Sequence, residues 1–473
     1  MKIAVIGEGI IGNFVSQYLS KKGHKVECIS PEIKVSKKDH NRDNEKFFAD
    51  SNKLKSPKLN KNELLQYKSE TEKIFLKESS EFYSLELGCE MGLSRYWGAN
   101  LAYEALKDDL KNLKLNDEEI SFIDEMIPFL NVQSYYKKFN YKNYNYKDIR
   151  NLKSSVVAIY ENKLKKNSFL GFDNSEAIFG NRKINKYKYS KIDGIVLKIE
   201  FENSNPRLLI KESNLIYKKN YDFVLLSSGA LGSYRLVMNS FNLNKNIFNY
   251  MDKLNHHPLL TSICFLPKVP YPENYIGISN MDAKFKIENI NIFINFIPLE
   301  SALRIFKANF LKNVKINFLK IWFKKISNFL KLFSEFLIIP IWILRRLYVA
   351  NIYLPSELSA SFIGCKDNKI SIIGGLRSDF KKLILIKLWN NLLKVSFFKG
   401  IYFLFVKPLK VSLGADLHYA SSLSQYTNPQ AKLKDHKNKS KLIIVDSSSS
   451  SYLPTANPTL YFLARSIRLL RDL

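Results

Sequence analysis

The stretch MKIAVIGEGIIGNFVSQYLSKKGHKVECIS, residues 1–30, decides the fold. Met1–Ile6 is a short apolar run rich in residues that favour strands. Three glycines follow it at the spacing G-x-G-x-x-G, namely Gly7, Gly9 and Gly12. The next apolar residues recur at helical spacing, Gly23 stops this helix, and residues 24–30 again favour a strand. The order strand, glycine turn, helix, strand predicts the opening βαβ unit of a dinucleotide-binding fold.

Each glycine of this turn has its own physical role. The first permits the tight turn, the second lets a pyrophosphate approach the backbone, and the third lets the helix pack on the strand. The helix N-terminus adds N–H groups and a partial positive charge. The acid that usually holds the ribose is replaced by Ser30, and Glu32 follows two residues later as either a ribose ligand or a surface acid.

The composition is that of a globular protein with a full core. The chain has 473 residues, of which 46% are hydrophobic and 25% charged, which suits two or three domains. The net charge of +29 raises the question of a nucleic-acid or membrane partner. Lysine outnumbers arginine by 60 to 13, whereas nucleic-acid binders favour the planar guanidinium of arginine. We therefore interpret the lysines as solubilising charge and predict no nucleic-acid partner.

The cysteines and the N-terminus indicate a reducing compartment. The four cysteines are far apart and form no CxxC pair: Cys28, Cys89, Cys264 and Cys365. This spacing predicts buried thiols and neither a disulfide framework nor a metal site. Glycines interrupt the N-terminal apolar run and no small-residue cleavage site follows, so we expect a mature cytoplasmic start.

The residue composition and the hydrophobic pattern change along the rest of the chain. Residues 33–80 are polar and predict loop and exposed helix with some disorder, and residues 101–170 look helical, then rich in Tyr and Lys. Strand patterns recur from Lys191 to Ser228 as GIVLKIEF, RLLIKE and DFVLLSS. Residues 259–411 begin with strands and continue with long basic amphipathic stretches.

Later motifs narrow the kind of dinucleotide. GCEMGLSRYWGAN stands at 88–100, DFVLLSSGALGSYRL at 222–236, and SLGADLHYASSLS and VDSSSSSYLPTANPT within 412–459. With the N-terminal glycines, and in this order, they resemble the glucose–methanol–choline (GMC) family of flavin oxidoreductases. The chain is most similar to a bacterial branch linked to polysaccharide or glycolipid metabolism.

The resemblance implies an α/β fold with a Rossmann-like, GMC-type FAD-binding lobe and a second, α+β substrate lobe. Residues 1–258 would form the FAD-binding lobe, with helical or loop excursions at 33–80 and 101–190. Residues 259–411 would form the substrate lobe with its basic amphipathic helices. Residues 412–473 would return to the FAD lobe and carry the active site.

The resemblance also implies roles for single residues. His418 matches the active-site histidine that takes the hydroxyl proton of an alcohol. Asn457 matches the second active-site position, whose amide hydrogen-bonds the substrate oxygen. The pair His256-His257 before Pro258 matches a structural turn at the domain crossover.

The implied FAD contacts come from every part of the chain. Trp97, Gly98, Ala99 and Asn100 would line the flavin, and Ser228, Gly229 and Ala230 would form the strand end that faces the cofactor. Val196 would lie near the adenine. Asp446 and Ser447 would contact the phosphate and ribityl region, and Pro458 and Thr459 would pass beside the isoalloxazine. Gly7, Gly9, Gly12, Ser30 and Glu32 complete the set.

The residues suit the implied chemistry. Oxidising an alcohol needs a hydride acceptor, which FAD supplies, and a group that takes the hydroxyl proton. Histidine, with an ordinary pKa near 6.5, suits this second task at neutral pH. We expect oxidation of a CH–OH group of a small-molecule alcohol or saccharide, with a sugar or glycolipid as the favoured substrate. Two alternatives stay open: a catalytically silent flavoprotein scaffold in envelope polysaccharide biosynthesis, and an NAD(P)-dependent dehydrogenase.

Two basic amphipathic stretches bear on where in the cell the protein is located. Residues 304–346 hold ten Lys or Arg residues and one acid, and residues 380–407 repeat this texture. They are either ordinary helices with lysines facing outward or a peripheral surface for anionic headgroups. The first interpretation places the protein in the cytoplasm, and the second places it at the inner face of the membrane.

Overall fold

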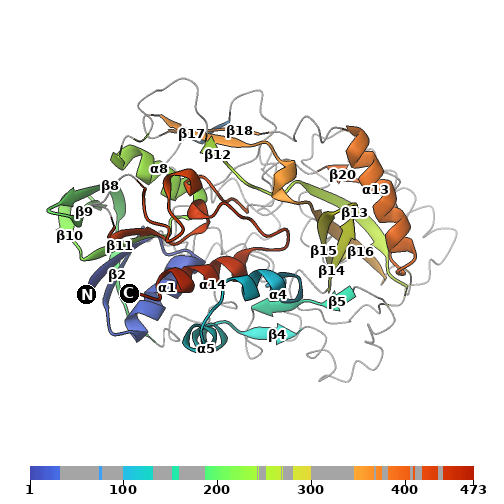
Figure 1. Ribbon diagram of the computed structural model, residues 1–473, viewed down its shortest axis with the longest axis horizontal. Coiled ribbons are helices and arrows are strands. Elements are labelled where there is room, and N and C mark those ends of the chain that lie inside the picture. The colour runs from blue at the N-terminus through green and yellow to red at the C-terminus, as the bar shows by residue number, and fades with distance from the viewer. Residues whose placement is uncertain are drawn as a thin grey trace, which may run out of the picture.

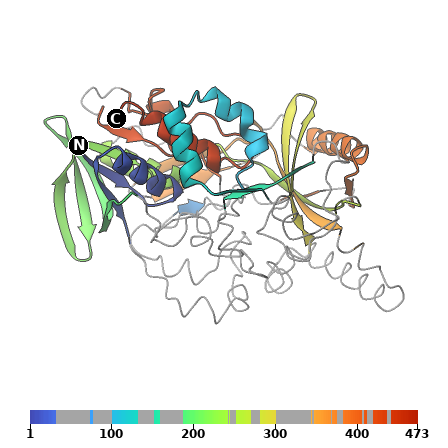
Figure 2. The same cartoon turned by 90° about the horizontal axis from the view of Figure 1, so that it is seen from below.

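The computed structural model describes most of the predicted nucleotide lobe and much of the second lobe. The described residues are 1–31, 74–76, 100–131, 152–158, 187–241, 243, 252–267, 269, 281–299, 343, 346–366, 369–374, 382–404, 408–410, 418–434 and 440–473. A parallel sheet lies at the end that carries both termini, and an antiparallel sheet lies at the other end (Figure 1). Helices α4 (Tyr103–Asn112) and α14 (Thr459–Leu469) lie between them (Figures 1 and 2).

The parallel sheet has five strands in the order β21-β11-β1-β2-β7. Their bounds are Lys2–Ile6 for β1, Lys25–Ser30 for β2, Ser190–Asp193 for β7, Phe223–Leu226 for β11 and Leu442–Ile444 for β21. The chain runs from β1 through α1 (Ile10–Lys21) to β2 on one side, whereas β11 lies on the other side of β1. The strand order therefore reverses at β1, which is where open α/β sheets bind their ligands.

The alternation of side chains along β1 explains why helices cover both faces of this sheet. Ile3 and Val5 belong to the core that contains Phe14 and Tyr18 of α1. Ala4 and Ile6 face the other way and share a core with α8 (Gly229–Phe241). Because successive side chains of a strand point to opposite faces, the five residues of β1 must be almost wholly apolar.

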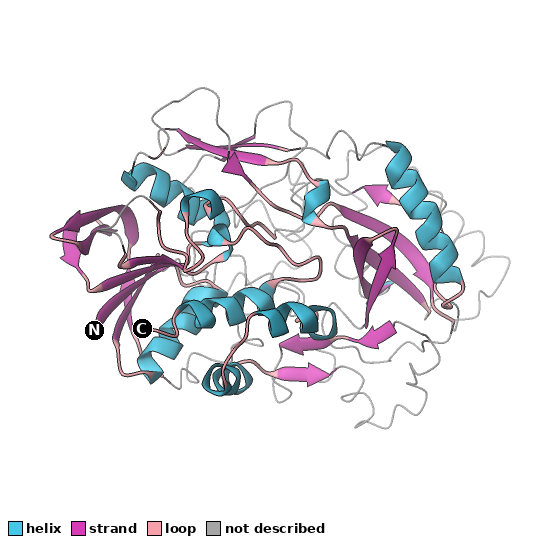
Figure 3. Cartoon of the chain, viewed as in Figure 1, coloured by secondary structure: helices cyan, strands magenta, loops and turns pink. Residues whose placement is uncertain are grey.

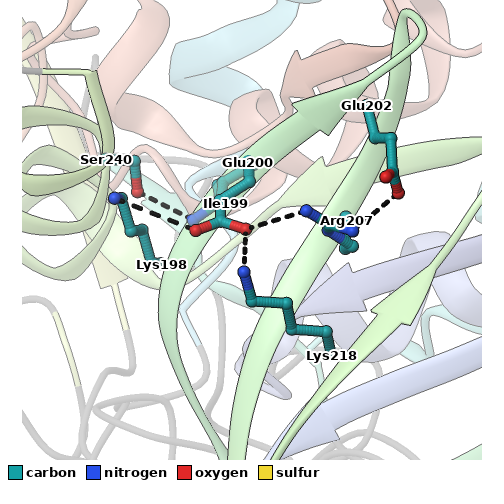
Figure 4. A network of polar contacts seen from close by, with 7 residues as sticks. All are labelled: Lys198, Ile199, Glu200, Glu202, Arg207, Lys218 and Ser240. Carbon is teal, nitrogen blue, oxygen red and sulfur yellow. Dashed lines mark hydrogen bonds and ion pairs between the residues drawn. The ribbon is translucent and has the colours of Figure 1, made fainter.

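A three-stranded antiparallel sheet extends the nucleotide lobe. Its strands are β8 (Ile195–Glu202), β9 (Asn205–Glu212) and β10 (Leu215–Asn220). The backbone N–H of Ile199 donates to Ser240 Oγ of α8 at 2.9 Å. The opposite side carries paired charges, because Glu200 contacts both Lys218 (2.8 Å) and Arg207 (3.5 Å) (Figure 4). The surface of this sheet is therefore mixed in charge.

The second lobe is built on a seven-stranded sheet (Figure 3). Four long antiparallel strands form its centre: β13 (Leu259–Phe265), β16 (Leu347–Tyr353), β15 (Ile290–Pro298) and β14 (Met281–Ile287). Three short strands complete it: β5 (Leu152–Ser154), β19 (Tyr402–Phe403) and β20 (Leu409–Lys410). Helix α13 (Lys382–Phe397) packs on it through Trp389, whose ring lies 5.2 Å from that of Phe403.

Smaller elements join the two lobes. A four-stranded sheet has the order β12-β17-β18-β3, with bounds Asp252–Lys253, Phe362–Lys366, Lys369–Ile373 and Ile74–Leu76. Helix α5 (Asp117–Met126) lies near α14, and β4 (Phe129–Asn131) pairs with β6 (Val156–Ala158). Short 3₁₀ helices are η4 (Ser356–Leu358), η6 (Ser424–Tyr426) and η8 (Ser447–Ser449).

The strands and the helix predicted from the N-terminal stretch are confirmed as β1, α1 and β2, and those predicted after Lys191 as β8, β9 and β11. The prediction of loop and helix over 33–80 is wrong at Ile74–Leu76, which form β3 beside β18. The remainder of that segment lies outside the described residues. The helical prediction for 101–170 holds for α4 and α5 but fails at β4, β5 and β6, because pairing with distant strands decides these short segments.

The buried thiols are partly confirmed. Cys28 and Cys264 are buried and free, whereas Cys365 is half-buried. Cys89 lies outside the described residues.

Glycines 9 and 12 give a matched test of the packing between α1 and the sheet. A Cβ at Gly12 would overlap the carbonyl oxygen of Gly7 and lie 2.7 Å from Ser227 Oγ, whereas a Cβ at Gly9 would meet nothing within 4 Å. We expect Gly12→Ala to lower the free energy of unfolding by about 3 kcal/mol, because α1 must move away from the sheet. Gly9→Ala should change it by less than about 0.5 kcal/mol. Urea unfolding followed by circular dichroism measures both, and equal losses would contradict the packing described here.

Candidate active site

The candidate site lies at the carboxyl ends of β1, β11 and β21, where three distant segments meet. Ser227, directly after β11, donates its hydroxyl to the carbonyl oxygens of Ile6 (2.9 Å) and Gly7 (2.8 Å). Gly7 has a φ of +98°, and a Cβ there would lie 2.8 Å from the carbonyl oxygen of Ser227. The first glycine of the motif is therefore required by both backbone conformation and close approach.

The N-terminus of α1 is open toward this edge. Gly9 is the N-cap residue, and no side chain caps the helix there. No acidic residue occupies the first turn, and in the described part of the chain no atom beyond the neighbours of Gly9 lies within 4 Å of the position a Cβ would take there. A helix N-terminus with open space above a glycine fits the phosphate group of a dinucleotide. The predicted roles of Gly7, Gly9 and Gly12 are thus compatible with the geometry.

The glycine turn carries a carboxylate that the sequence analysis did not explain. Glu8 is buried, and its Oε2 lies 2.5 Å from Lys191 Nζ of β7. The hydroxyl of Tyr189 donates to Glu8 Oε1 at 3.2 Å and accepts from Asn13 Nδ2 at 2.9 Å. The lysine therefore balances the negative charge that would otherwise repel a phosphate at the neighbouring N-terminus of α1.

An exposed acid at this edge, Asp193, comes from β7. Ser30, which replaces the usual ribose ligand, is buried at the end of β2 and is in register with Asp193 of the parallel neighbour β7. Asp193 is exposed. The sequence alone does not place this acid beside Ser30, because only the pairing of β2 with β7 shows that the two residues are neighbours. Glu32 lies outside the described residues, and the predicted adenine neighbour Val196 is half-buried in β8.

Asp446 links the C-terminal segment to α8. Its Oδ2 accepts from the N–H of Gly229 (3.0 Å) and from Ser233 Oγ (2.5 Å). Its Oδ1 accepts from the N–H and Oγ of Ser448 (3.0 and 2.5 Å). Burial raises the pKa of this carboxyl, and hydrogen bonds from Ser233, Ser448 and Gly229 counteract part of that rise. Both carboxylate oxygens therefore accept hydrogen bonds from the protein, and the contact of Asp446 with FAD stays a prediction.

Ser447 and its neighbours hold the segment that carries His418. Ser447 Oγ donates to the carbonyl oxygen of Tyr419 at 2.7 Å. The carbonyl of Ser447 accepts from the N–H of Ser421 at 3.1 Å. Ala420 and Asn255 exchange two backbone hydrogen bonds of 3.0 Å. The three residues after His418 are therefore attached to η8 on one side and to residue 255 on the other.

Two rings pack against the imidazole of His418. Tyr353, the last residue of β16, stacks on it with a centroid distance of 6.1 Å, and His257 lies edge-on at 5.8 Å. His257 Nδ1 is 3.2 Å from the carbonyl oxygen of Leu354, and this nitrogen carries the proton because a carbonyl only accepts. Burial lowers the pKa of His257 to about 3, so His257 is neutral at ordinary pH.

His256 and His257 both have the buried, hydrogen-bonded environment of a structural turn. His256 Nε2 is 2.9 Å from Ser361 Oγ, and burial lowers its pKa to about 4. His257 also packs its ring against His418, a contact that the sequence does not predict.

Asn457 lies just before the N-terminus of α14. It is buried, and its Oδ1 accepts from the N–H (3.2 Å) and the Oγ1 (2.9 Å) of Thr459. These bonds fix the oxygen and so orient the Nδ2 group. Pro458 is the N-cap residue, and Arg465 of the same helix donates to Ser449 Oγ at 3.0 Å. The segments of His418 and Asn457 are thus both attached to η8, while their pairing over a substrate stays a prediction.

The predicted flavin-lining stretch is described only at its last residue. Asn100 is buried, its Nδ2 donates to Asp282 Oδ1 of β14 at 2.9 Å, and its Oδ1 accepts from the N–H of Ala102 at 2.6 Å. It therefore connects the start of α4 to the second lobe. Three predicted residues lie outside the described part of the chain: Trp97, Gly98 and Ala99. At the strand end predicted to face the cofactor, Ser228 is half-buried, Gly229 is exposed and Ala230 is buried.

The comparisons with known proteins concern the fold. No protein-family model matches the chain, and no curated protein matches its sequence. Pyridoxine 4-oxidase from Mesorbium loti has a TM-score of 0.58 at 10% identity, covering 100% of this chain and 99% of its own. A formate oxidase structure has a TM-score of 0.54 at 11% identity, covering 99% and 96%. An Aspergillus oryzae formate oxidase variant, solved for the effect of its mutation on FAD modification, gives the same values. The predicted two-lobed α/β fold is thus confirmed over nearly the whole chain.

Asp446 offers a test of how the site is held together. Each of its oxygens accepts one backbone N–H, so in Asp446→Asn either orientation of the amide directs an NH₂ group at a backbone donor. We expect a loss of about 1–3 kcal/mol in the free energy of unfolding. The matched control is Asp124→Asn on the exposed face of α5, which should change it by less than about 0.5 kcal/mol. Denaturant midpoints measure both, and an unaffected Asp446→Asn would contradict the bridging role.

Proposed function

We propose that this protein is an FAD-dependent oxidoreductase that oxidises a CH–OH group to a carbonyl. The observation that carries the proposal is the meeting of the glycine turn, the start of α8 and the Asp446 segment at one sheet edge. That edge is open at Gly9 in a fold shared with oxidases over almost their full length. The formate oxidase variant, solved for the effect of its mutation on FAD modification, supports the choice of FAD.

The residues that would hold the cofactor are those of the open edge. The N-terminus of α1 at Gly9 would take the pyrophosphate, and the exposed carboxylate of Asp193 would face the ribose and adenine side. Bound FAD supplies a hydride acceptor. The protein contributes orientation and proton transfer, which is where its own side chains matter.

His418 is the proposed base. Its ring packs against Tyr353 and His257, which also contact each other at 5.9 Å, so the three rings form one cluster that restricts the imidazole on that side. The hydroxyl of Ser447 fixes the backbone one residue further along the chain. A base held in this way takes the hydroxyl proton of the substrate as the C–H bond breaks, and such a positioned base contributes about 100- to 10,000-fold.

Asn457 is the proposed partner of the substrate oxygen. Thr459 occupies its oxygen atom, so the Nδ2 group is the end of the amide available to donate a hydrogen bond. A neutral donor stabilises the negative charge that develops on the substrate oxygen without competing for the proton.

The proposed substrate is a saccharide or glycolipid hydroxyl, as the sequence resemblance implies. The two alternatives give different outcomes in one experiment on the purified protein. An oxidoreductase shows flavin absorption bands that bleach when an alcohol donor is added without oxygen. A silent scaffold keeps its bands with every donor, and an NAD(P)-dependent dehydrogenase shows no flavin bands. Protein that is colourless even after reconstitution with FAD would overturn the proposal.

Replacing His418 separates proton transfer from packing. His418→Phe keeps a ring against Tyr353 and His257 but removes the base. We expect the purified variant to retain its flavin bands and its melting temperature, with anaerobic bleaching about 100- to 10,000-fold slower. Stopped-flow absorbance measures the rate. The control His24→Gln keeps the donor to the carbonyl of Leu473 and should bleach at the wild-type rate. Wild-type bleaching in His418→Phe would exclude His418 as the base.

Asn457→Asp tests the amide donor. The substitution keeps an oxygen for the two bonds from Thr459 and exchanges the Nδ2 donor for a negative oxygen. Stability should be unchanged or slightly raised, because an acid near a helix N-terminus is favourable. The rate of bleaching should fall about 100- to 1,000-fold, as for loss of one donor to a developing oxyanion. The same stopped-flow measurement decides, and a rate within twofold of wild type would remove Asn457 from the mechanism.

A further inference from the structure

The C-terminal end of α13 exposes aromatic side chains. Phe397 and Phe398 are 59% and 86% exposed, and Leu404, directly after β19, is 50% exposed. Helix α13 lies at the end of the molecule far from both termini, on the outer side of the second lobe (Figures 1 and 2). We call Phe397, Phe398 and Leu404 the aromatic tip.

The backbone of the tip is fixed. Gly400 has a φ of +75° and donates to the carbonyl of Phe397 at 3.0 Å, and Ile401 donates to the carbonyl of Ser396 at 3.0 Å. This is the Schellman pattern that ends a helix. The ring of Phe397 stands edge-on to that of Tyr402 at 5.2 Å. The ring of Phe398 in turn stands edge-on to that of Phe397 at 6.0 Å, so the fold holds both rings together outside the core.

Lysines accompany the tip. The described segment from Lys382 to Leu404 contains four lysines and no acidic residue. Lys394 is on the exposed face of α13, and Lys399 Nζ lies 5.3 Å from the ring centroid of Phe285. Lys387 pairs with Glu288 at 3.1 Å, so positive charge is in excess toward the tip.

The geometry points to docking of the aromatic tip on an anionic membrane surface. Exposed Phe and Leu side chains bury favourably at the boundary between lipid headgroups and acyl chains, and lysines beside them attract acidic lipids. No helix in the described part of the chain is long and apolar enough to span a bilayer, so the contact would be peripheral. The partner is thus a bilayer that carries acidic headgroups.

Charge argues against a second copy of this chain as the partner. A twofold contact places the same patch of both subunits face to face. Lys394 and Lys399 of the two copies would then meet without an acidic residue of the same segment to separate them. Anionic headgroups complement the same lysines.

Vesicle flotation of the full chain tests the inference. The probes are phosphatidylcholine vesicles with and without phosphatidylglycerol, in low and high salt. We expect binding only to the anionic vesicles, weakened by salt because the lysine contribution is screened. Phe397→Asp/Phe398→Asp should reduce the bound fraction about tenfold or more, since two buried rings are lost. Phe398→Trp should keep the wild-type binding and show a blue-shifted emission on anionic vesicles.

The control removes two exposed apolar residues elsewhere. Leu215 and Ile216 of β10 are 71% and 59% exposed and lie at the opposite end of the molecule (Figure 1). Leu215→Asp/Ile216→Asp adds the same negative charge and should leave binding within twofold. No binding by the wild type, or an equal loss in this control, would overturn the inference. So would a dimer in sedimentation analysis that Phe397→Asp/Phe398→Asp abolishes, because the tip would then serve a second copy. Circular dichroism confirms that each variant folds.

Discussion

The carboxylate of Asp446 is the interaction on which the rest of the site depends. It is buried, and it joins the N-terminus of α8 to η8 through four hydrogen bonds. A carboxylate out of water is costly unless such donors surround it, so the four groups must be in place together. Because η8 in turn holds the segment of His418 and receives Arg465 of α14, one ionisable group orders both halves of the candidate site.

The second lobe completes what the nucleotide lobe begins. Tyr353 ends a strand of the antiparallel sheet, and His257 immediately precedes that sheet in the chain. Their rings contact His418, which belongs to the C-terminal segment attached to the nucleotide lobe. The candidate base therefore lies at the junction of the lobes. Such junctions are common places for small-molecule sites, because neither lobe alone encloses a ligand.

The parts of the fold that sequence could predict are those encoded locally. The glycine turn, α1 and β2 follow from one continuous stretch, since each residue's role depends on near neighbours. The pairing of Ser30 with Asp193, and the pairing of Glu8 with Lys191, depend on strands far apart in the chain. No local pattern contains such information. For the same reason β3 and β5 were not predicted, because each is a three-residue strand stabilised by a distant partner.

The neutrality of His257 explains how two histidines can adjoin without conflict. A positive charge on His257, whose ring lies 5.8 Å from His418, would oppose protonation of His418 by about 3 kcal/mol at an effective dielectric constant of about 20. Burial prevents this charge, and the carbonyl of Leu354 fixes the neutral tautomer. His257 thus supplies a wall and not a competing base. The residue that the sequence assigned to a structural turn is therefore a neutral ring beside the proposed base.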